Sequence, residues 1–189
     1  FNYLLAKKHG GEFLLRVEDT DRERSTDEAI QAILDGMSWL ELKHDGEVEF
    51  QTKRYPLYFE HIDRLVAEDK AYPCFCSSEE IQEKREAAQK SGEKYKYDRK
   101  CWKLTPEERQ AKIQADEPHC IRFYSTDEGT VVIDDLIKGQ VTVEAKELDD
   151  LIIRRTDGNP TYNLTVVVDD ALMEISHVIR GEEWLPSLP

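Results

Sequence analysis

The amino-acid sequence predicts an α/β fold in which two outer segments of mixed strand and helix flank a middle segment of helices followed by strands. An apolar run at residues 11–15, followed at once by crowded charges, is typical of a buried strand with polar groups at its carboxyl end. Apolar residues at helical spacing between positions 29 and 40 indicate a helix after this strand. From Cys120 onward, short runs rich in Val, Ile and Thr indicate strands.

The first 72 residues are predicted to be helical on either side of that strand. Residues 1–10 have the pattern of the end of an amphipathic helix, closed by two lysines and a pair of glycines. Thr26 and its neighbouring serine offer an N-cap for the next helix, which runs to about Leu40 and whose Met37 and Trp39 we expect in the core. We also expect a turn-rich connector at residues 43–50 and a helix from residue 55 to about 70.

Capping residues define the helices of the middle segment. Ser77 is the predicted N-cap of a highly charged helix that ends before Gly92, and Thr105 with Pro106 begins another helix. Strands are expected at residues 121–123, 130–135, 139–143 and 151–154. A turn at residues 157–160 precedes two further predicted strands, at residues 166–170 and 175–180.

Three carboxylates, those of Glu18, Asp19 and Asp21, crowd the end of the first predicted strand. Such carboxylates repel one another unless cations or hydrogen-bond donors lie among them. In an open α/β sheet the carboxyl ends of the strands are also where ligands bind. The stretch therefore predicts either a ligand site or a polar turn in which Asp21 caps the next helix.

Composition narrows the class of protein. The chain has 189 residues, a formal charge of −14 and four cysteines. This charge argues against a nucleic-acid partner for the molecule as a whole, although binding faces are local. There is no apolar run of eighteen residues and no pattern of a signal peptide, so we expect a cytoplasmic protein with metal-bound or free thiols. Because the sequence begins within a helix and without Met, we expect it to be a fragment.

Two blocks resemble glutamyl-tRNA synthetases, which are class I aminoacyl-tRNA synthetases. Residues 16–22 (RVEDTDR) resemble the RIEDTDR signature of that family. The second block comprises residues 156–164 (TDGNPTYNL), 166–170 (VVVDD) and 177–184 (HVIRGEEW). The likeness covers essentially the whole chain in order, and two long blocks so far apart are far more specific than one short motif.

The resemblance implies a Rossmann-type nucleotide-binding catalytic domain that is interrupted by an α+β connective domain for the tRNA acceptor end. The catalytic domain would comprise residues 1–72, without its first strand, and residues 159–189, truncated, while residues 73–158 would form the inserted domain. The chain would be the central part of a bacterial-type enzyme. Because this part lacks the HIGH and KMSKS motifs, the fragment alone should not activate an amino acid.

The resemblance also implies site residues. Glu18, Tyr162 and Arg180 would line the glutamate pocket, in which an Arg fork suits a carboxylate and an acid suits the ammonium group. Glu183 and Trp184 would belong to the ATP site. From the residues alone, Arg180 could instead pair with Asp169 or Asp170, Tyr162 could be a core aromatic, and the acids after Gly181 could begin a helix.

A basic segment suggests where RNA binds. Residues 84–103 contain eight basic and three acidic residues, a local net charge of +5, interleaved with aromatic residues. We expect Lys96 and Arg99 to contact tRNA there, although a solvated helix would look similar. The resemblance implies two further tRNA contacts, Asp21 and Arg24, because the matching positions in the family approach the tRNA 3′ end. Arg24 could equally be a surface residue of the next helix.

Three cysteines have the pattern of a metal site. Cys74, Cys76 and Cys101 supply three soft ligands, and zinc needs a fourth donor to complete a tetrahedron. Some family members place that donor where Lys103 stands here, whereas related enzymes use a Cys-x-Cys, Tyr-x-x-x-Cys arrangement, which matches with Tyr97. The resemblance thus favours structural zinc on Cys74, Cys76, Tyr97 and Cys101 over unmetallated thiols, with Cys120 as a core residue.

The expected function is ATP-dependent ligation of L-glutamate to tRNA(Glu) through glutamyl-adenylate, with Mg²⁺ and structural Zn²⁺, in a monomer that has no membrane contact. One alternative is the paralogue that activates glutamate without tRNA and modifies queuosine, although its acidic motif typically reads EDLD where this chain has EDTD. Another is a non-catalytic tRNA-binding module.

Overall fold

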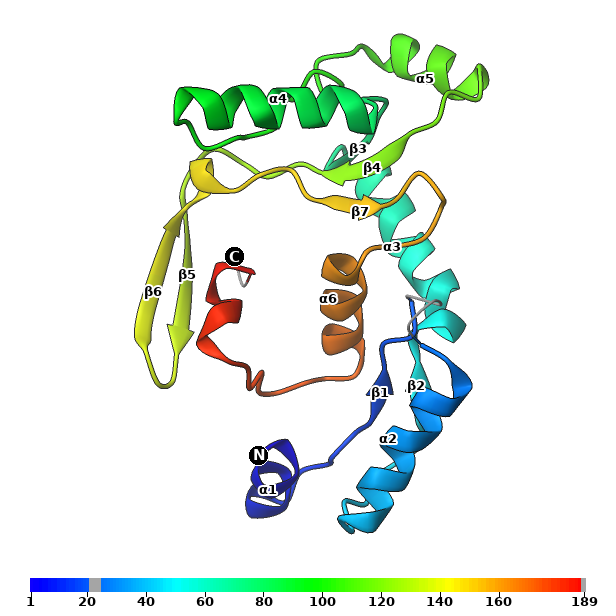
Figure 1. Ribbon diagram of the computed structural model, residues 1–189, viewed down its shortest axis with the longest axis vertical. Helices are drawn as coiled ribbons and strands as arrows, with labels where there is room; N and C mark the ends of the chain where they lie inside the picture. The colour runs from blue at the N-terminus through cyan, green and yellow to red at the C-terminus, as the bar shows by residue number, and fades with distance from the viewer. Residues whose placement is uncertain (21–24, 188–189) are drawn as a thin grey trace.

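The computed structural model describes residues 1–20 and 25–187 (Figure 1). Its α-helices are α1 (Asn2–His9), α2 (Asp27–Trp39), α3 (Tyr55–Ala67), α4 (Ser78–Ser91), α5 (Pro106–Gln114) and α6 (Tyr162–Leu172), and its 3₁₀ turns are η1 (Gln51–Arg54), η2 (Ala145–Glu147) and η3 (Glu182–Ser187). Its strands are β1 (Arg16–Val17), β2 (Glu49–Phe50), β3 (Ala71–Cys74), β4 (Cys120–Phe123), β5 (Thr130–Asp135), β6 (Gly139–Glu144) and β7 (Ile152–Arg154).

The first two strands are short and form a parallel pair. Arg16 lies opposite Glu49, and Val17 lies opposite Phe50. The strand predicted at residues 11–15 was therefore misplaced, because pairing begins only where the apolar run ends, and residues 13–17 are half-buried. The connector at 43–50 is irregular apart from a bend at residues 45–46, so the turns predicted there are not found. Its last two residues form β2, which sequence reasoning missed because two residues give no periodicity.

Helix ends were predicted well because caps are local. Gly10 closes α1 with a left-handed φ of 65°, which glycine adopts without strain. The hydroxyls of Thr26, Ser77 and Thr105 accept backbone N–H bonds at the starts of α2, α4 and α5. The expectation that Trp39 packs in the core was wrong, since it is 83% exposed, while Met37 is half-buried.

An antiparallel sheet of order β3-β4-β7 holds the middle of the chain and separates two apolar clusters. Side chains alternate between the two faces of a strand. Ala71, Ile121 and Ile153 face α3 and α6, whereas Tyr72 and Cys120 face the cysteine-rich cluster beside α4 (Figure 1). The sheet thereby connects α6 with the cysteine cluster.

The cluster on the α3 and α6 side contains Tyr58 and Ile62 of α3 together with Leu164 and Val168 of α6. It thus draws on residues from either side of the segment expected to form an inserted domain, and the boundaries near positions 72 and 159 stay a prediction. Among the described residues, no helix is long and apolar enough to cross a membrane.

The strand predicted at residues 166–170 is wrong, because these residues lie in α6. Four buried residues of α6 explain the helix: Leu164, Thr165, Val168 and Asp169 recur at the spacing of one helical face. Three consecutive valines resemble a strand locally, but burial along one helical face outweighs their β propensity. Residues 175–180, also expected to be a strand, have no regular secondary structure.

A long hairpin projects from the sheet. Strands β5 and β6 pair from Thr130 with Glu144 to Asp135 with Gly139, as the alternating sequence predicted. In Figure 1 the hairpin runs alongside the C-terminal segment. At its tip, Lys138 Nζ lies 2.7 Å from Glu182 Oε2 in η3, so the hairpin contacts the C-terminal segment at this ion pair.

Candidate functional site

The acidic motif at the end of β1 is held by the 3₁₀ turn η1. Asp19 accepts two hydrogen bonds from Thr52, one from the backbone N–H at 2.9 Å and one from the hydroxyl at 2.5 Å. Glu18 is exposed, and its Oε1 lies 3.4 Å from Arg16 Nη2. Asp19 therefore ties the motif to η1, while the Glu18 carboxylate is left accessible.

Beneath this motif, the fully buried carboxylate of Asp169 joins four elements. It accepts hydrogen bonds from Gln51 Nε2 at 3.1 Å, Arg54 Nε at 2.8 Å and the Tyr58 hydroxyl at 2.8 Å, and Arg16 Nε lies 3.7 Å away. Burial, together with the hydrogen bond to Asp169, raises the pKa of Tyr58. The cluster fixes β1, η1 and α3 against α6, the helix that begins with Tyr162.

Tyr162, Arg180 and Trp184, three residues predicted to bind substrates, lie together. The Arg180 guanidinium carbon lies 5.6 Å from the ring centre of Tyr162 and 4.8 Å from that of Trp184, and the two rings are 6.3 Å apart. Cation–π attraction holds such a guanidinium near aromatic faces and leaves its N–H groups free to donate. The arrangement offers a cation, a phenol and an apolar face for an anionic substrate and a flat ring.

Two alternatives for Arg180 can be checked directly. It does not pair with Asp169 or Asp170 among the described contacts, since Arg16 and Arg54 bind those carboxylates. The prediction that Arg180 ends a strand was wrong, because Arg180 is exposed in an irregular segment. Glu183 is exposed beside it, and the described contacts place Glu18 against Arg16 and not against Arg180.

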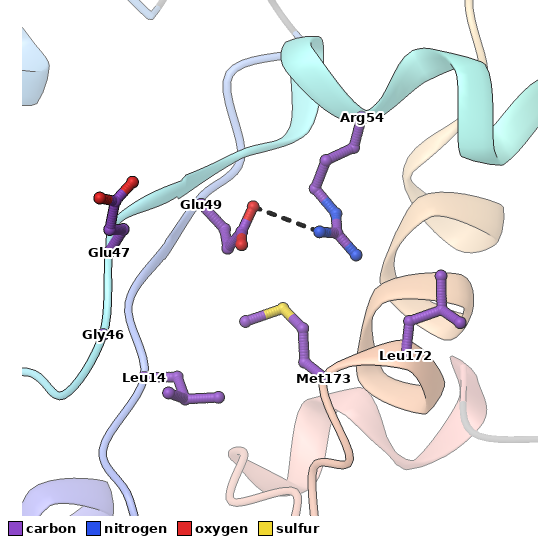
Figure 2. A pocket seen from close by; sticks show the side chains of 7 residues that line it. All are labelled: Leu14, Gly46, Glu47, Glu49, Arg54, Leu172 and Met173. Carbon is purple, nitrogen blue, oxygen red and sulfur yellow. Dashed lines mark hydrogen bonds and ion pairs between the residues drawn. The ribbon is translucent and has the colours of Figure 1, made fainter.

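Two pockets are each lined in part by residues of η1. One, of about 270 Å³, is walled by β2, η1 and the end of α6, and Figure 2 shows the ion pair between Glu49 and Arg54 across it, at 3.2 Å. The residues that line it are Leu14, Gly46, Glu47, Glu49, Arg54, Leu172 and Met173, none of which was predicted to bind a substrate. A second, of about 340 Å³, borders the acidic motif at Asp19 and Thr52.

Four predicted metal ligands converge to one point between β3 and α4. The sulfurs of Cys74, Cys76 and Cys101 all lie within 4.8 Å of one another. The Tyr97 hydroxyl lies 3.2 Å from Cys74 Sγ and 3.4 Å from Cys76 Sγ, and it accepts a hydrogen bond from the Cys101 backbone N–H at 3.3 Å. Three sulfurs and one oxygen gathered in this way can supply four donors to a metal ion, the number that tetrahedral coordination needs.

The chemistry of the cluster suits a metal. The pKa of Cys74 is lowered because the thiols of Cys101 and Cys120 donate to its sulfur, and the same bond to Cys74 raises the pKa of Cys101. The cluster thus favours a thiolate, the form that binds a metal. Cys120 is buried in this core, as predicted. Sequence reasoning missed Arg122, whose guanidinium carbon lies 4.2 Å from the Tyr97 ring centre.

Half of the eight cations of the basic segment form ion pairs within the described protein. Lys96 Nζ lies 2.9 Å from Asp127 Oδ1, and Arg99 binds both Asp127 and the buried carboxylate of Asp150. Within the described chain, Lys90 and Lys94 make no ion pair and are exposed. The predicted tRNA residues Asp21 and Arg24 lie outside the described residues.

The aromatic residues of the same segment are packed inward. Tyr97 is buried, and Trp102 stacks on Tyr124 with ring centres 4.4 Å apart. Arg85 lies over the ring of Tyr95 at 5.5 Å. These contacts hold the segment to the sheet, and an interaction between its aromatic rings and unpaired bases stays a prediction.

Comparison with known proteins gives consistent matches along the whole chain. A family model described as "tRNA synthetases class I (E and Q), catalytic domain" matches residues 1–189. A glutamate–tRNA ligase of Geobacter sulfurreducens is 50% identical over 189 residues, and one of Trichlorobacter lovleyi is 52% identical over 190 residues; each alignment covers all of this chain and 39% of the relative.

Solved structures agree. A glutamate tRNA ligase from Elizabethkingia meningosepticum, crystallised with its amino acid, is similar with a TM-score of 0.90 at 32% identity, over 99% of this chain and 40% of that one. A glutamate–tRNA synthetase from Elizabethkingia anophelis is similar with a TM-score of 0.89 at 32% identity, over 99% of this chain and 41% of that one. The chain therefore spans about two fifths of the length of its relatives.

Proposed function

The chain belongs to the family of class I tRNA synthetases specific for glutamate and glutamine, and we propose that the protein containing it ligates L-glutamate to tRNA(Glu). The reaction would consume ATP and pass through glutamyl-adenylate. The observation that carries the proposal is the full coverage of this chain by glutamate–tRNA ligases at 50–52% identity. The grouping of Tyr162, Arg180 and Trp184 supports it, because glutamate and adenine need these kinds of contact.

In this proposal the side chains position substrates and do not form covalent bonds with them. The Arg180 fork pairs with the side-chain carboxylate of glutamate while Tyr162 donates a hydrogen bond, and Glu18 binds the ammonium group. Trp184 offers its face to adenine, Glu183 holds the nucleotide nearby, and Mg²⁺ supplies charge to the phosphates when bound. Holding the α-carboxylate of glutamate in line with the α-phosphate would favour formation of its bond to phosphorus as the bond to pyrophosphate breaks, and orientation lowers this barrier.

We propose that the segment 73–158 binds the acceptor end of tRNA through Lys96 and Arg99. Asp21 and Arg24, which belong to the proposed catalytic domain, would bind the tRNA 3′ end. Because Lys96 and Arg99 already bind Asp127, their contact with phosphate would require that carboxylate to release them. Exposed Lys90 and Lys94 need no such exchange. We further propose that the protein is a cytoplasmic monomer, since reduced thiols persist in that compartment.

Glutamate-dependent exchange of pyrophosphate into ATP is expected for the full-length protein when tRNA(Glu) is present, and only background exchange is expected without it. The reason is that the acceptor end would complete the site before the adenylate forms. The measurement is incorporation of labelled pyrophosphate into ATP with and without tRNA(Glu), and with glutamine in place of glutamate as control.

The same assay separates the alternatives. Full exchange without tRNA would contradict the proposal and favour the paralogue that activates glutamate alone. If no exchange occurs with or without tRNA, the protein is better explained as a non-catalytic tRNA-binding module. Exchange that depends on glutamine would indicate a glutamine-specific member of the family.

For the metal site, we propose structural Zn²⁺ held by Cys74, Cys76, Cys101 and Tyr97. The donors fit the ion because three sulfurs and a phenol oxygen already surround one point. The Cys101→Ser variant is expected to lose stoichiometric zinc and to unfold at a lower temperature, because structural zinc contributes directly to folding free energy. Zinc content after gel filtration and thermal unfolding with and without a chelator test this.

The fourth cysteine provides the matched control. Cys120 is buried beside the cluster but is not one of the proposed ligands, so Cys120→Ala should retain zinc at the wild-type ratio. If the wild-type protein holds no zinc as purified, and none after zinc has been added back, the proposed site is contradicted. A Cys101→Ser variant that keeps its zinc would contradict it as well.

A further inference from the structure

Arg122 is a buried cation whose charge has no carboxylate partner among the described residues. It lies in β4 opposite Tyr72, and it is 7% exposed. Its Nη1 donates a hydrogen bond of 2.7 Å to the backbone carbonyl of Asp150, and its Nε has no hydrogen-bond partner in the described chain. A guanidinium buried in this way is costly unless a negative charge lies near it.

The predicted metal ligands, when they hold a metal as thiolates, are one source of that negative charge. The guanidinium carbon lies 4.2 Å from the centre of the Tyr97 ring. Arg122 therefore lies against Tyr97, one of the four proposed ligands, on the sheet side of the cluster.

The charges of a filled site explain this placement. A zinc ion with three thiolates and a neutral phenol carries one net negative charge, and burying it would be as unfavourable as burying the lone guanidinium. We propose that Arg122 is the counter-charge of the cysteine–tyrosine metal site, a positioning residue that lets thiolate-bound zinc be buried under the sheet. This inference rests on the zinc site proposed above.

The test is the zinc affinity of Arg122 variants of the full-length protein, measured by competition with a chromophoric chelator. Arg122→Gln keeps a donor for the Asp150 carbonyl but removes the charge, and its affinity should be about 10- to 100-fold weaker, the usual effect of removing an outer partner of a metal site. Arg122→Lys keeps the charge and should lose less. Cobalt(II) absorption reports whether three thiolates still bind.

Arg109 offers a matched control in the same core. Its guanidinium carbon lies 5.1 Å from the Trp102 ring, and its Nη2 donates to the Trp102 carbonyl. Arg109→Gln should therefore leave zinc affinity unchanged, whatever it does to stability.

Three results would overturn the inference. Wild-type affinity in Arg122→Gln would show that the charge is not needed. Equal losses of zinc affinity in Arg122→Gln and Arg122→Lys would show that the site requires the shape of Arg122 and not its charge. If Arg122→Gln does not fold, a loss of zinc affinity of 10-fold or more in Arg122→Lys would show the same. A wild-type protein that binds no zinc would overturn the metal site and this inference together.

Discussion

The variant Asp169→Asn is expected to lower the free energy of unfolding by about 3–5 kcal/mol, the cost of breaking a buried ionic cluster by removing one partner. The Asp169 carboxylate is fully buried and accepts hydrogen bonds from Gln51, Arg54 and Tyr58. An amide has the same shape but no charge, and its NH₂ group would face these donors. Urea unfolding followed by circular dichroism measures the change.

The neighbouring Asp170 is the matched control. Its carboxylate lies 2.8 Å from Arg16 Nη1, but its side chain is 29% exposed, so water can replace part of the interaction. Asp170→Asn should therefore cost about 0–1 kcal/mol. Equal effects of the two substitutions would contradict the view that Asp169 is the centre of the cluster.

The fold class was confirmed by the family match, since class I catalytic domains are of Rossmann type, and local signals predicted most helices. Thr26, Ser77 and Thr105 each satisfy a backbone N–H a few residues away, so their effect is visible in a short stretch of sequence. The strands from residue 120 to 154 were also found, because alternation over several residues is unambiguous.

The failures occurred where distant residues decide the structure. Residues 166–170 read as a strand, but α6 forms because one of its faces is buried against α3 and the β3-β4-β7 sheet. Strand β3 was not predicted: it has only four residues, one of them Pro73, and its pairing partner β4 lies nearly fifty residues further along the chain. Neither packing surface can be found from a local window.

The candidate site divides in the same way. The spacing of Cys74, Cys76, Tyr97 and Cys101 predicted a metal site, because closely spaced cysteines outside secreted proteins often bind a metal. The structure brings these four residues together. The cluster around Asp169 was not predicted. Gln51 and Asp169 are 118 positions apart, and neither local sequence indicates which distant residue it contacts. Charged residues within an apolar run, as at the end of VVVDD, were the only signal available.

Replacing Arg180 should have the largest effect on the proposed reaction. Arg180→Gln is expected to lower kcat/KM for glutamate about 100- to 1,000-fold, because truncating one partner of a desolvated charge pair costs about 2–5 kcal/mol or more. Arg180 is held between Tyr162 and Trp184, with its N–H groups available to a carboxylate. Aminoacylation kinetics of the full-length protein at varied glutamate concentration measure the change.

Arg155 is the control for a general loss of surface charge. Its side chain is 49% exposed, and its Nε lies 3.6 Å from Asp157 Oδ2, so Arg155→Gln should change kcat/KM less than about two-fold. Arg180→Lys should restore only part of the activity, because an ammonium cannot match the bidentate fork. If Arg180→Gln keeps its affinity for glutamate, the carboxylate is bound elsewhere, and the contacts of Arg180 with Tyr162 and Trp184 serve only to hold the C-terminal segment in place.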